Sequence, residues 1–174
     1  MNQQLVFTII AQDKPGIVTT VSDTVNQHGG NWLDSRMSQL AGEFAGIVHV
    51  EVPLDQKKPL ENALAALAEN GLHITVRQAG EMLAEGNYKL HEIEIFGNDR
   101  PGIVAEVSKL FSEKAINILE FDTDINDAPV TGGQLFHADA IIGVAKGTDL
   151  DELQDKLHDL ADALSLDIEW TSRI

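Results

Sequence analysis

The sequence contains no cysteine among its 174 residues. This absence excludes disulfides, thiol nucleophiles and thiolate metal ligands, and it suits a reducing cytoplasmic compartment. Basic residues are also few, because Lys and Arg total 12 against 28 Asp and Glu, which gives a net charge of −16. Binding to nucleic acid or to an anionic membrane depends on clustered Lys and Arg. We therefore expect no direct contact with nucleic acid or membrane.

Long apolar runs and aromatic residues are scarce as well. No run approaches the roughly 18 residues that a membrane-spanning helix needs, and the N-terminus lacks the basic region of a signal peptide. Aromatic residues make up 5% of the chain, too few for the stacking surface of an RNA-recognition motif. Apolar residues still reach 43%, which is typical of globular proteins with a core. These features indicate a cytoplasmic globular protein.

A six-residue segment occurs twice. Asp13-Lys14-Pro15-Gly16-Ile17-Val18 recurs as Asp99-Arg100-Pro101-Gly102-Ile103-Val104, at an offset of 99 − 13 = 86. Asn31 and Asn117 are separated by the same offset, 117 − 31 = 86. Two anchors that share one offset indicate an internal duplication.

Each half shows the same order of periodicities. Strand-like segments over 5–11 and 90–97 run into the repeated turn, and helical spacing begins at Ile17 and Ile103. Alternation then returns, with Leu33, Ser35 and Met37 expected on one face and Leu119, Phe121, Thr123 and Ile125 on one face of the second copy. A further strand, helix and strand follow in each half. The order βαββαβ, present twice, predicts an α+β protein with two tandem ferredoxin-like domains.

The expected boundaries follow from this order. We expect one domain over 1–80, a linker over 81–87 that contains glycine and lacks periodicity, and a second domain over 88–174. Six extra residues fall in a glycine-rich loop at 126–133 of the second copy. Thr148 with Asp151 matches a capping box at the start of the last helix.

The repeated turn has the chemistry of a small anion-binding cup. Proline restricts the residue before it to extended conformations, so Pro15 and Pro101 end their strands sharply. Glycine after each proline permits close approach to the backbone, and the first-turn N–H groups of the following helix have no internal partner. Such a cup suits a carboxylate. A purely structural turn, capped by the side chain of Asp13 or Asp99, is the alternative.

This pattern resembles the ACT domain, and the resemblance covers nearly the whole chain. The segments Asn31-Trp32-Leu33-Asp34-Ser35-Arg36-Met37 and Gly42-Glu43-Phe44 make the first half similar to the glycine cleavage system transcriptional repressor group. ACT domains bind small ligands, often amino acids, at interfaces between two such domains. The resemblance implies ligand contacts at the repeated turn and at the start of the second strand, namely Asp13, Lys14, Pro15, Gly16, Ile17, Val18, Asn31 and Leu33, and Asp99, Arg100, Pro101, Gly102, Ile103, Val104, Asn117 and Leu119.

The same resemblance implies a function. We expect a non-catalytic regulator that binds a glycine- or serine-like amino acid and acts through a protein partner such as a DNA-binding transcriptional activator, with homo-oligomerisation left open. The second copy reads Asn117-Ile118-Leu119-Glu120-Phe121-Asp122 and lacks the Asp-Ser-Arg of the first. The copies are therefore expected to differ in affinity, or only one binds. A ligand-free protein-interaction module is the alternative.

Enzymatic and metal-binding interpretations are disfavoured. Acylphosphatase shares the βαββαβ order, but Asp13 and Asp99 would repel a phosphate at the first loop. Formyltetrahydrofolate deformylase carries a similar N-terminal domain, yet this chain ends before a catalytic domain could follow. The six histidines lack metal-ligand spacing, and His137 with Asp139 is the nearest pair to it. We expect no catalytic residues, no metal and no cofactor.

Overall fold

The structure is a computed structural model that describes residues 1–80, 88–127 and 132–172. The chain divides into two compact units, Met1–Glu81 and Met82–Ile174. The linker expected over 81–87 and positions 128–131 of the expected glycine-rich loop lie outside the described residues. Each unit is described by itself.

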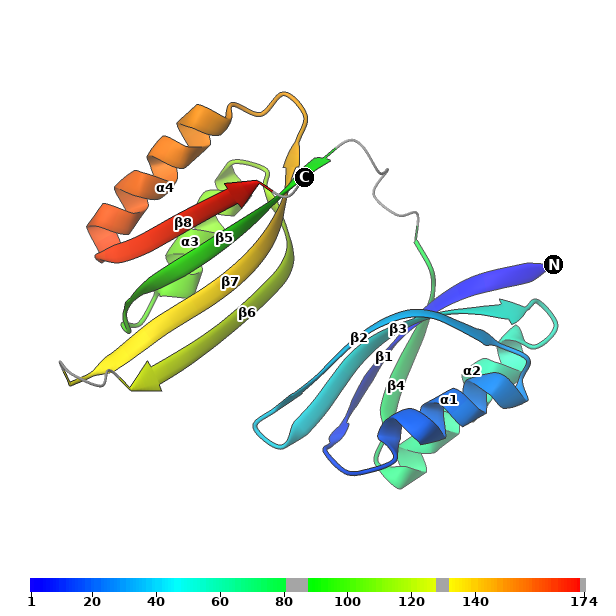
Figure 1. Cartoon of the computed structure of the whole chain (residues 1–174). Helices are drawn as coiled ribbons and strands as arrows, with labels where there is room; N and C mark the ends of the chain where they lie inside the picture. Colours follow the sequence, from blue (N-terminus) through cyan, green and yellow to red (C-terminus); the bar gives the residue numbers. More distant parts are fainter. Residues whose placement is uncertain (81–87, 128–131, 173–174) are drawn as a thin grey trace. The chain divides into compact units, whose positions relative to one another are not determined.

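The first unit contains a four-stranded antiparallel sheet in the order β2-β3-β1-β4. Both of its α-helices cover the same face of the sheet (Figure 1). Its elements are β1 (Asn2–Gln12), α1 (Ile17–Gln27), β2 (Asn31–Leu40), β3 (Glu43–Pro53), α2 (Lys57–Ala66), the short 3-10 helix η1 (Leu67–Asn70) and β4 (His73–Gln78).

The second unit repeats this topology, with the sheet order β6-β7-β5-β8. The expected α+β class with two tandem ferredoxin-like units is confirmed. Its elements are β5 (Tyr88–Asn98), α3 (Ile103–Glu113), β6 (Asn117–Asp127), β7 (Gln134–Ala145), α4 (Leu150–Leu164) and β8 (Leu166–Ser172).

Each core lies between the helices and one face of the sheet. In β1 every second residue is buried, because side chains along a strand point alternately to its two faces. The helices contribute residues one turn apart, such as Ile17, Val21 and Val25 in α1. The opposite face of each sheet carries no helix of its own unit. The fully buried side chains of β1 and β3 in the first core are Leu5, Phe7, Ile9, Val48, Val50 and Val52.

The alternation expected around Leu33 and Leu119 is wrong, and the reason is a β-bulge. The pairing register of β2 with β3 shifts between Trp32 and Asp34, and that of β6 with β7 shifts between Ile118 and Glu120. A bulge inserts one unpaired residue and re-aims its side chain. Leu33 and Leu119 are these inserted residues, and they are 41% and 45% exposed.

Candidate functional site

The repeated turn places a glycine at the N-cap of α1 and of α3. Gly16 has φ 93° and Gly102 has φ 100°, a left-handed conformation that other residues adopt only with strain. A Cβ built on either glycine would meet nothing within 4 Å. The backbone therefore requires glycine here, and the space above each turn is open.

The helix amides beside these glycines lack a side-chain cap. The first intrahelical bonds run from the Thr20 N–H to the Gly16 carbonyl at 2.9 Å and from the Glu106 N–H to the Gly102 carbonyl at 3.0 Å. The amides before them have no intrahelical acceptor, and a glycine cap offers no side-chain oxygen. In the described parts of the chain both turns thus present backbone donors at a helix N-terminus, where an anion is stabilised.

The two aspartates of the motif use their backbone rather than capping the helix. The Asp13 N–H donates to the Gly42 carbonyl at 2.9 Å, and the Asp99 N–H donates to the Gln134 carbonyl at 2.8 Å. The first bond joins its turn to the connection between β2 and β3, and the second joins its turn to the first residue of β7. The alternative in which an aspartate side chain caps the helix has no hydrogen bond to support it among the described residues.

Lys14 and Arg100 occupy equivalent positions but differ in their contacts. Lys14 Nζ donates to the carbonyl oxygen of Asn70 at 3.0 Å, which ties the first turn to the end of η1. Arg100 is exposed. The basic residue of the first turn therefore stabilises the fold, whereas that of the second projects into solvent.

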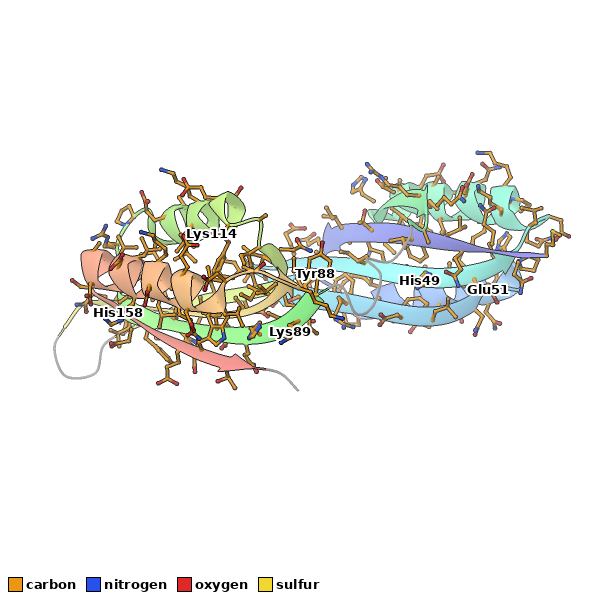
Figure 2. The ribbon with its side chains drawn as sticks, turned by 90° about the horizontal axis from the view of Figure 1, so that it is seen from above. His49, Glu51, Tyr88, Lys89, Lys114 and His158 are labelled. Atoms are coloured by element: carbon orange, nitrogen blue, oxygen red, sulfur yellow. The ribbon has the colours of Figure 1, made fainter. Side chains whose placement is uncertain are left out.

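Asn31 and Leu33 lie at the other end of the first sheet. Asn31 of β2 and Gln4 of β1 are both opposite Glu51 of β3, which is labelled in Figure 2. Asn31 is therefore level with Gln4, near the start of β1, whereas the turn follows Gln12 at the other end of β1. Eight residues of strand separate Gln4 from Gln12, which corresponds to roughly 26 Å. Within one copy the structure does not bring the asparagine and the turn together.

The second copy has the same geometry. Asn117 and Leu90 are both opposite Gly143 of β7, and the turn follows Asn98 at the other end of β5. The span from Leu90 to Asn98 is again roughly 26 Å. Each unit thus carries two half-sites at opposite ends of its sheet.

The asparagine half-sites differ in charge. In the first copy Arg36 Nη1 pairs with Asp34 Oδ1 at 3.2 Å, and both side chains are about two-thirds exposed. Glu120 and Asp122 hold these places in the second copy. The surroundings of the two asparagines therefore differ in charge, and unequal affinity of the two copies stays a prediction.

A histidine is surrounded by carboxylates on the open face of the second sheet. His137 Nε2 lies 3.1 Å from Glu94 and 3.6 Å from Asp139, and Nδ1 lies 3.2 Å from Asp124. Burial lowers the pKa of His137, but the hydrogen bond to Glu94 and the charges of Asp139 and Asp124 outweigh it and raise the pKa.

This arrangement stabilises the protonated imidazole, and it also has the donor types of a metal site. The donor atoms of Glu94, His137 and Asp139 lie within 4.8 Å of one another, and these donor types suit a divalent cation. A metal, however, requires the deprotonated imidazole, and the carboxylates stabilise the protonated form. The spacing of His137 and Asp139 in the sequence made them the nearest pair to a metal site. Glu94 and Asp124 come from neighbouring strands, and only the strand register places them beside His137.

Sequence reasoning missed the burial of one histidine. His91 is 3% exposed, in a strand where His91, Ile93 and Ile95 alternate toward the core. That alternation was the available signal.

Two units of ferredoxin-like topology, each with an open glycine-capped turn, place the protein among tandem α+β proteins of the βαββαβ class. A family model described as "ACT domain" matches residues 3–77, and a second ACT domain model matches residues 85–166. The chain belongs to the ACT domain family and carries two ACT domains in tandem.

Similar proteins include one of assigned activity. Phosphoserine phosphatase SerB2 of Mycobacterium tuberculosis is 26% identical over 137 residues, which are 75% of this chain and 33% of the phosphatase. The chain therefore spans about a third of the length of this curated relative.

Two solved structures are similar along the whole chain. A protein of unknown function from Galdieria sulphuraria has a TM-score of 0.90 at 27% identity and covers 100% of both chains. A candidate glycine cleavage system transcriptional repressor has a TM-score of 0.70 at 21% identity and covers 99% of this chain and 98% of its own, a likeness of fold. Within the described residues, no helix has the length and apolarity needed to cross a membrane.

Proposed function

We propose that this protein is a non-catalytic regulator that binds a small glycine- or serine-like amino acid at interfaces between ACT domains and so modulates a protein partner. The observation that carries this proposal is the duplicated turn, in which Gly16 and Gly102 leave open space beside uncapped helix amides. Backbone donors at a helix N-terminus suit the carboxylate that every amino acid carries.

The asparagines supply the complementary half of such a site. An Asn side chain both donates and accepts hydrogen bonds, so Asn31 or Asn117 suits the ammonium and carboxylate of an amino acid. The turn and the asparagine lie at opposite ends of each sheet. A complete site would therefore take its turn from one ACT domain and its asparagine from a second ACT domain.

The exposed leucines fit a small ligand at this place. Leu33 and Leu119 stand out from their bulges beside the asparagines. An apolar side chain at the asparagine half would limit the space for the ligand side chain. That constraint favours glycine or serine over larger amino acids.

A DNA-binding transcriptional activator is the partner class that we propose. The net charge of −16 opposes direct contact with nucleic acid, whose affinity for proteins depends on basic residues. The activator itself rests on the resemblance of residues 13–44 to the glycine cleavage repressor group. Regulation would then pass through protein–protein contact.

Calorimetric titration of the full chain with glycine and L-serine tests the proposal. We expect saturable heat from at least one of them, and at least about a tenfold loss of affinity in the G16A or G102A variant, because hydrogen bonds to a charged group are lost. The matched control is G71A, since Gly71 also has a positive φ of 80° and open space around it but lies after η1. Equal loss in G71A, or no heat from either amino acid, would contradict the proposal.

A ligand-free interaction module is the second candidate, and the exposed leucines favour it. Exposed apolar side chains at equivalent places in both units suit a docking surface for protein. Size-exclusion chromatography with light scattering separates the two functions. If L33S and L119S change the association state while glycine and serine produce no heat, the interaction module is correct.

A further inference from the structure

The second ACT domain has a polar pair in its core where the first has an apolar pair. His91 is equivalent to Leu5, since 91 − 5 = 86, and Leu5 is fully buried. Trp170 lies opposite Ile93 in β5, as Val76 lies opposite Phe7 in β1. A Leu–Val pair in one copy thus corresponds to a His–Trp pair in the other.

The hydrogen bond within this pair fixes the tautomer of the imidazole. Trp170 Nε1 lies 3.0 Å from His91 Nδ1, and an indole nitrogen can only donate. Nδ1 is therefore the acceptor, and the proton of the neutral ring is on Nε2. Burial lowers the pKa of His91, and the charge of Lys89 lowers it further, so the ring is neutral at pH 7.

The remaining imidazole donor has no acceptor. His91 Nε2 is buried, and no hydrogen-bond partner is found for it among the described residues. Unpaired buried donors are rare and destabilising. A His in place of the equivalent leucine therefore costs stability unless Nε2 meets an external acceptor.

His91 lines a cavity of about 240 Å³ on the helix-covered side of the sheet. Trp170 does not line this cavity, and His91 Nε2 is not exposed to it. The full lining is Lys89, His91, Val144, Ala145, Lys146, Gly147, Thr148 and Leu150.

The charge of this cavity is opposite to that of the whole chain. The chain has 28 acidic residues against 12 basic ones, yet the described residues of the lining include two lysines and no carboxylate. Lys89 extends from the first part of β5 (Figure 2). Lys146 lies in the connection from β7 to α4. Both suit an anion.

The start of α4 also keeps negative charge out of the cavity. The capping box expected at Thr148 is not the one observed, because Asp149 is the N-cap and its Oδ1 accepts from the Glu152 N–H at 3.1 Å. The Asp149 carboxylate is thus engaged by the first helical turn. Thr148 lines the cavity instead and offers a hydroxyl.

We propose that this cavity binds a small aliphatic carboxylate. Its carboxylate would lie near Lys89 and Lys146, and it would accept from His91 Nε2–H after a small displacement of the cavity wall that covers this buried nitrogen. Val144 and Leu150 would contact its aliphatic part. A volume of about 240 Å³ is below that of drug-sized sites and suits a molecule of the size of butyrate. The cavity is at the opposite end of β5 from Gly102 and at the same end as Asn117, so it is separate from the proposed amino-acid cup at the turn.

Butyrate titration of the ¹⁵N-labelled full chain, followed by NMR, tests the proposal. We expect saturable shifts of the Trp170 indole N–H and of the His91 ring nitrogens. The ring nitrogens of His158, on α4 and outside the cavity lining, are the internal control and are expected to stay in place. If the Trp170 signal moves only at concentrations where the His158 signals also move, the proposal is wrong.

Inorganic phosphate distinguishes the carboxylate class from a general anion site. Phosphate can use the two lysines and His91 but not the apolar wall of Val144 and Leu150, so it should bind more weakly than butyrate. Phosphate binding as tight as that of butyrate would overturn the assignment to an aliphatic carboxylate.

Two sets of variants test the residues. K89Q/K146Q is expected to weaken butyrate binding by about tenfold or more, because charged hydrogen-bond donors are removed. K109Q is the control: it removes a lysine of α3 outside the cavity and is expected to leave butyrate binding unchanged. H91L/W170V rebuilds the Leu–Val pair of the first domain and should fold while losing butyrate binding, measured by saturation-transfer NMR on the ligand. Retained binding in H91L/W170V, or equal loss in K109Q, would contradict the site.

Discussion

Gly97 of β5 pairs directly with Leu166 of β8, and a Cβ built on Gly97 would lie 2.4 Å from Leu166 Cδ2. The same Cβ would lie 3.0 Å from the Ser165 carbonyl oxygen and 3.2 Å from Leu166 Cα. Backbone atoms cannot yield as a side-chain tip can, so the two strands must move apart if Gly97 gains a side chain.

Gly97→Ala is therefore expected to destabilise the second domain by about 1–3 kcal/mol, the usual cost of overpacking. Gly143→Ala is the matched control, because its Cβ would find its nearest atom at 3.5 Å, an ordinary contact. Urea unfolding of the full chain measures both variants. Equal free energies of unfolding for Gly97→Ala and Gly143→Ala would show that β8 moves to accommodate the added side chain without strain.

The hairpin between β2 and β3 stores strain at one residue. Ala41 has φ 52° and Gly42 has φ 85° in the two-residue turn that joins Leu40 to Glu43. Such turns favour Asn-Gly, and alanine in the left-handed region costs about 1 kcal/mol.

Ala41→Asn is expected to raise the free energy of unfolding of the first domain by roughly 0.5–1 kcal/mol. The control is Ala45→Asn on β3, a strand position where asparagine brings no such gain. Chemical denaturation measures both. A gain in Ala45→Asn as large as that in Ala41→Asn would argue against turn strain as the cause.

His91 makes the second domain less stable in acid. Burial and the charge of Lys89 lower its pKa from the ordinary value of 6.5. Between 6.5 and the lowered pKa the unfolded chain binds more protons than the folded chain, so stability falls as the pH falls through this window. Above 6.5 the contribution is fully present.

Unfolding of W32F at several pH values, followed by Trp170 fluorescence, measures this dependence. The same background carrying His91→Leu should lack the loss of stability that His91 causes below 6.5. An unchanged pH profile after this substitution would assign the acid sensitivity to other groups.

His137 has the opposite pH dependence. Burial lowers its pKa, but the hydrogen bond to Glu94 and the charges of Asp139 and Asp124 raise it overall above 6.5. The folded chain then holds the proton more tightly than the unfolded chain, so the stabilisation is complete below 6.5 and is lost as the pH rises through the raised pKa.

Asp124→Asn is expected to lower the pKa of His137, measured by proton NMR of its imidazole. Asp155→Asn on α4 removes the same charge away from the open sheet face and should leave the His137 titration unchanged. If Asp155→Asn lowers the pKa as much as Asp124→Asn does, long-range charge rather than contact controls it.

The fold could be predicted from the sequence because the repeat and the periodicities agree. Ile17, Val21 and Val25 are spaced for one helix face, and the structure buries all three. The bulges at Leu33 and Leu119 could not be predicted, because they arise from pairing with a distant strand. Alternation alone assigns both leucines to the wrong face.

The candidate sites were predictable to different extents. Local chemistry is enough to predict the conformation of the turn, because glycine permits the positive φ that Gly16 and Gly102 adopt, whereas its use as a ligand site stays a proposal. The proposed site at His91 depends on Trp170, 79 residues away, and on a cavity formed by two separate segments, 89–91 and 144–150. Periodicity indicates that His91 is buried, but not what it meets.

The opposite placement of turn and asparagine in each domain links ligand binding to association. If the second ACT domain of a site comes from another chain, the apparent affinity for the amino acid rises with protein concentration, because ligand and partner chain stabilise the same complex. If it comes from the same chain, the affinity is independent of dilution. Titrations at two protein concentrations would therefore reveal which chain completes the proposed site, without any knowledge of the proposed protein partner.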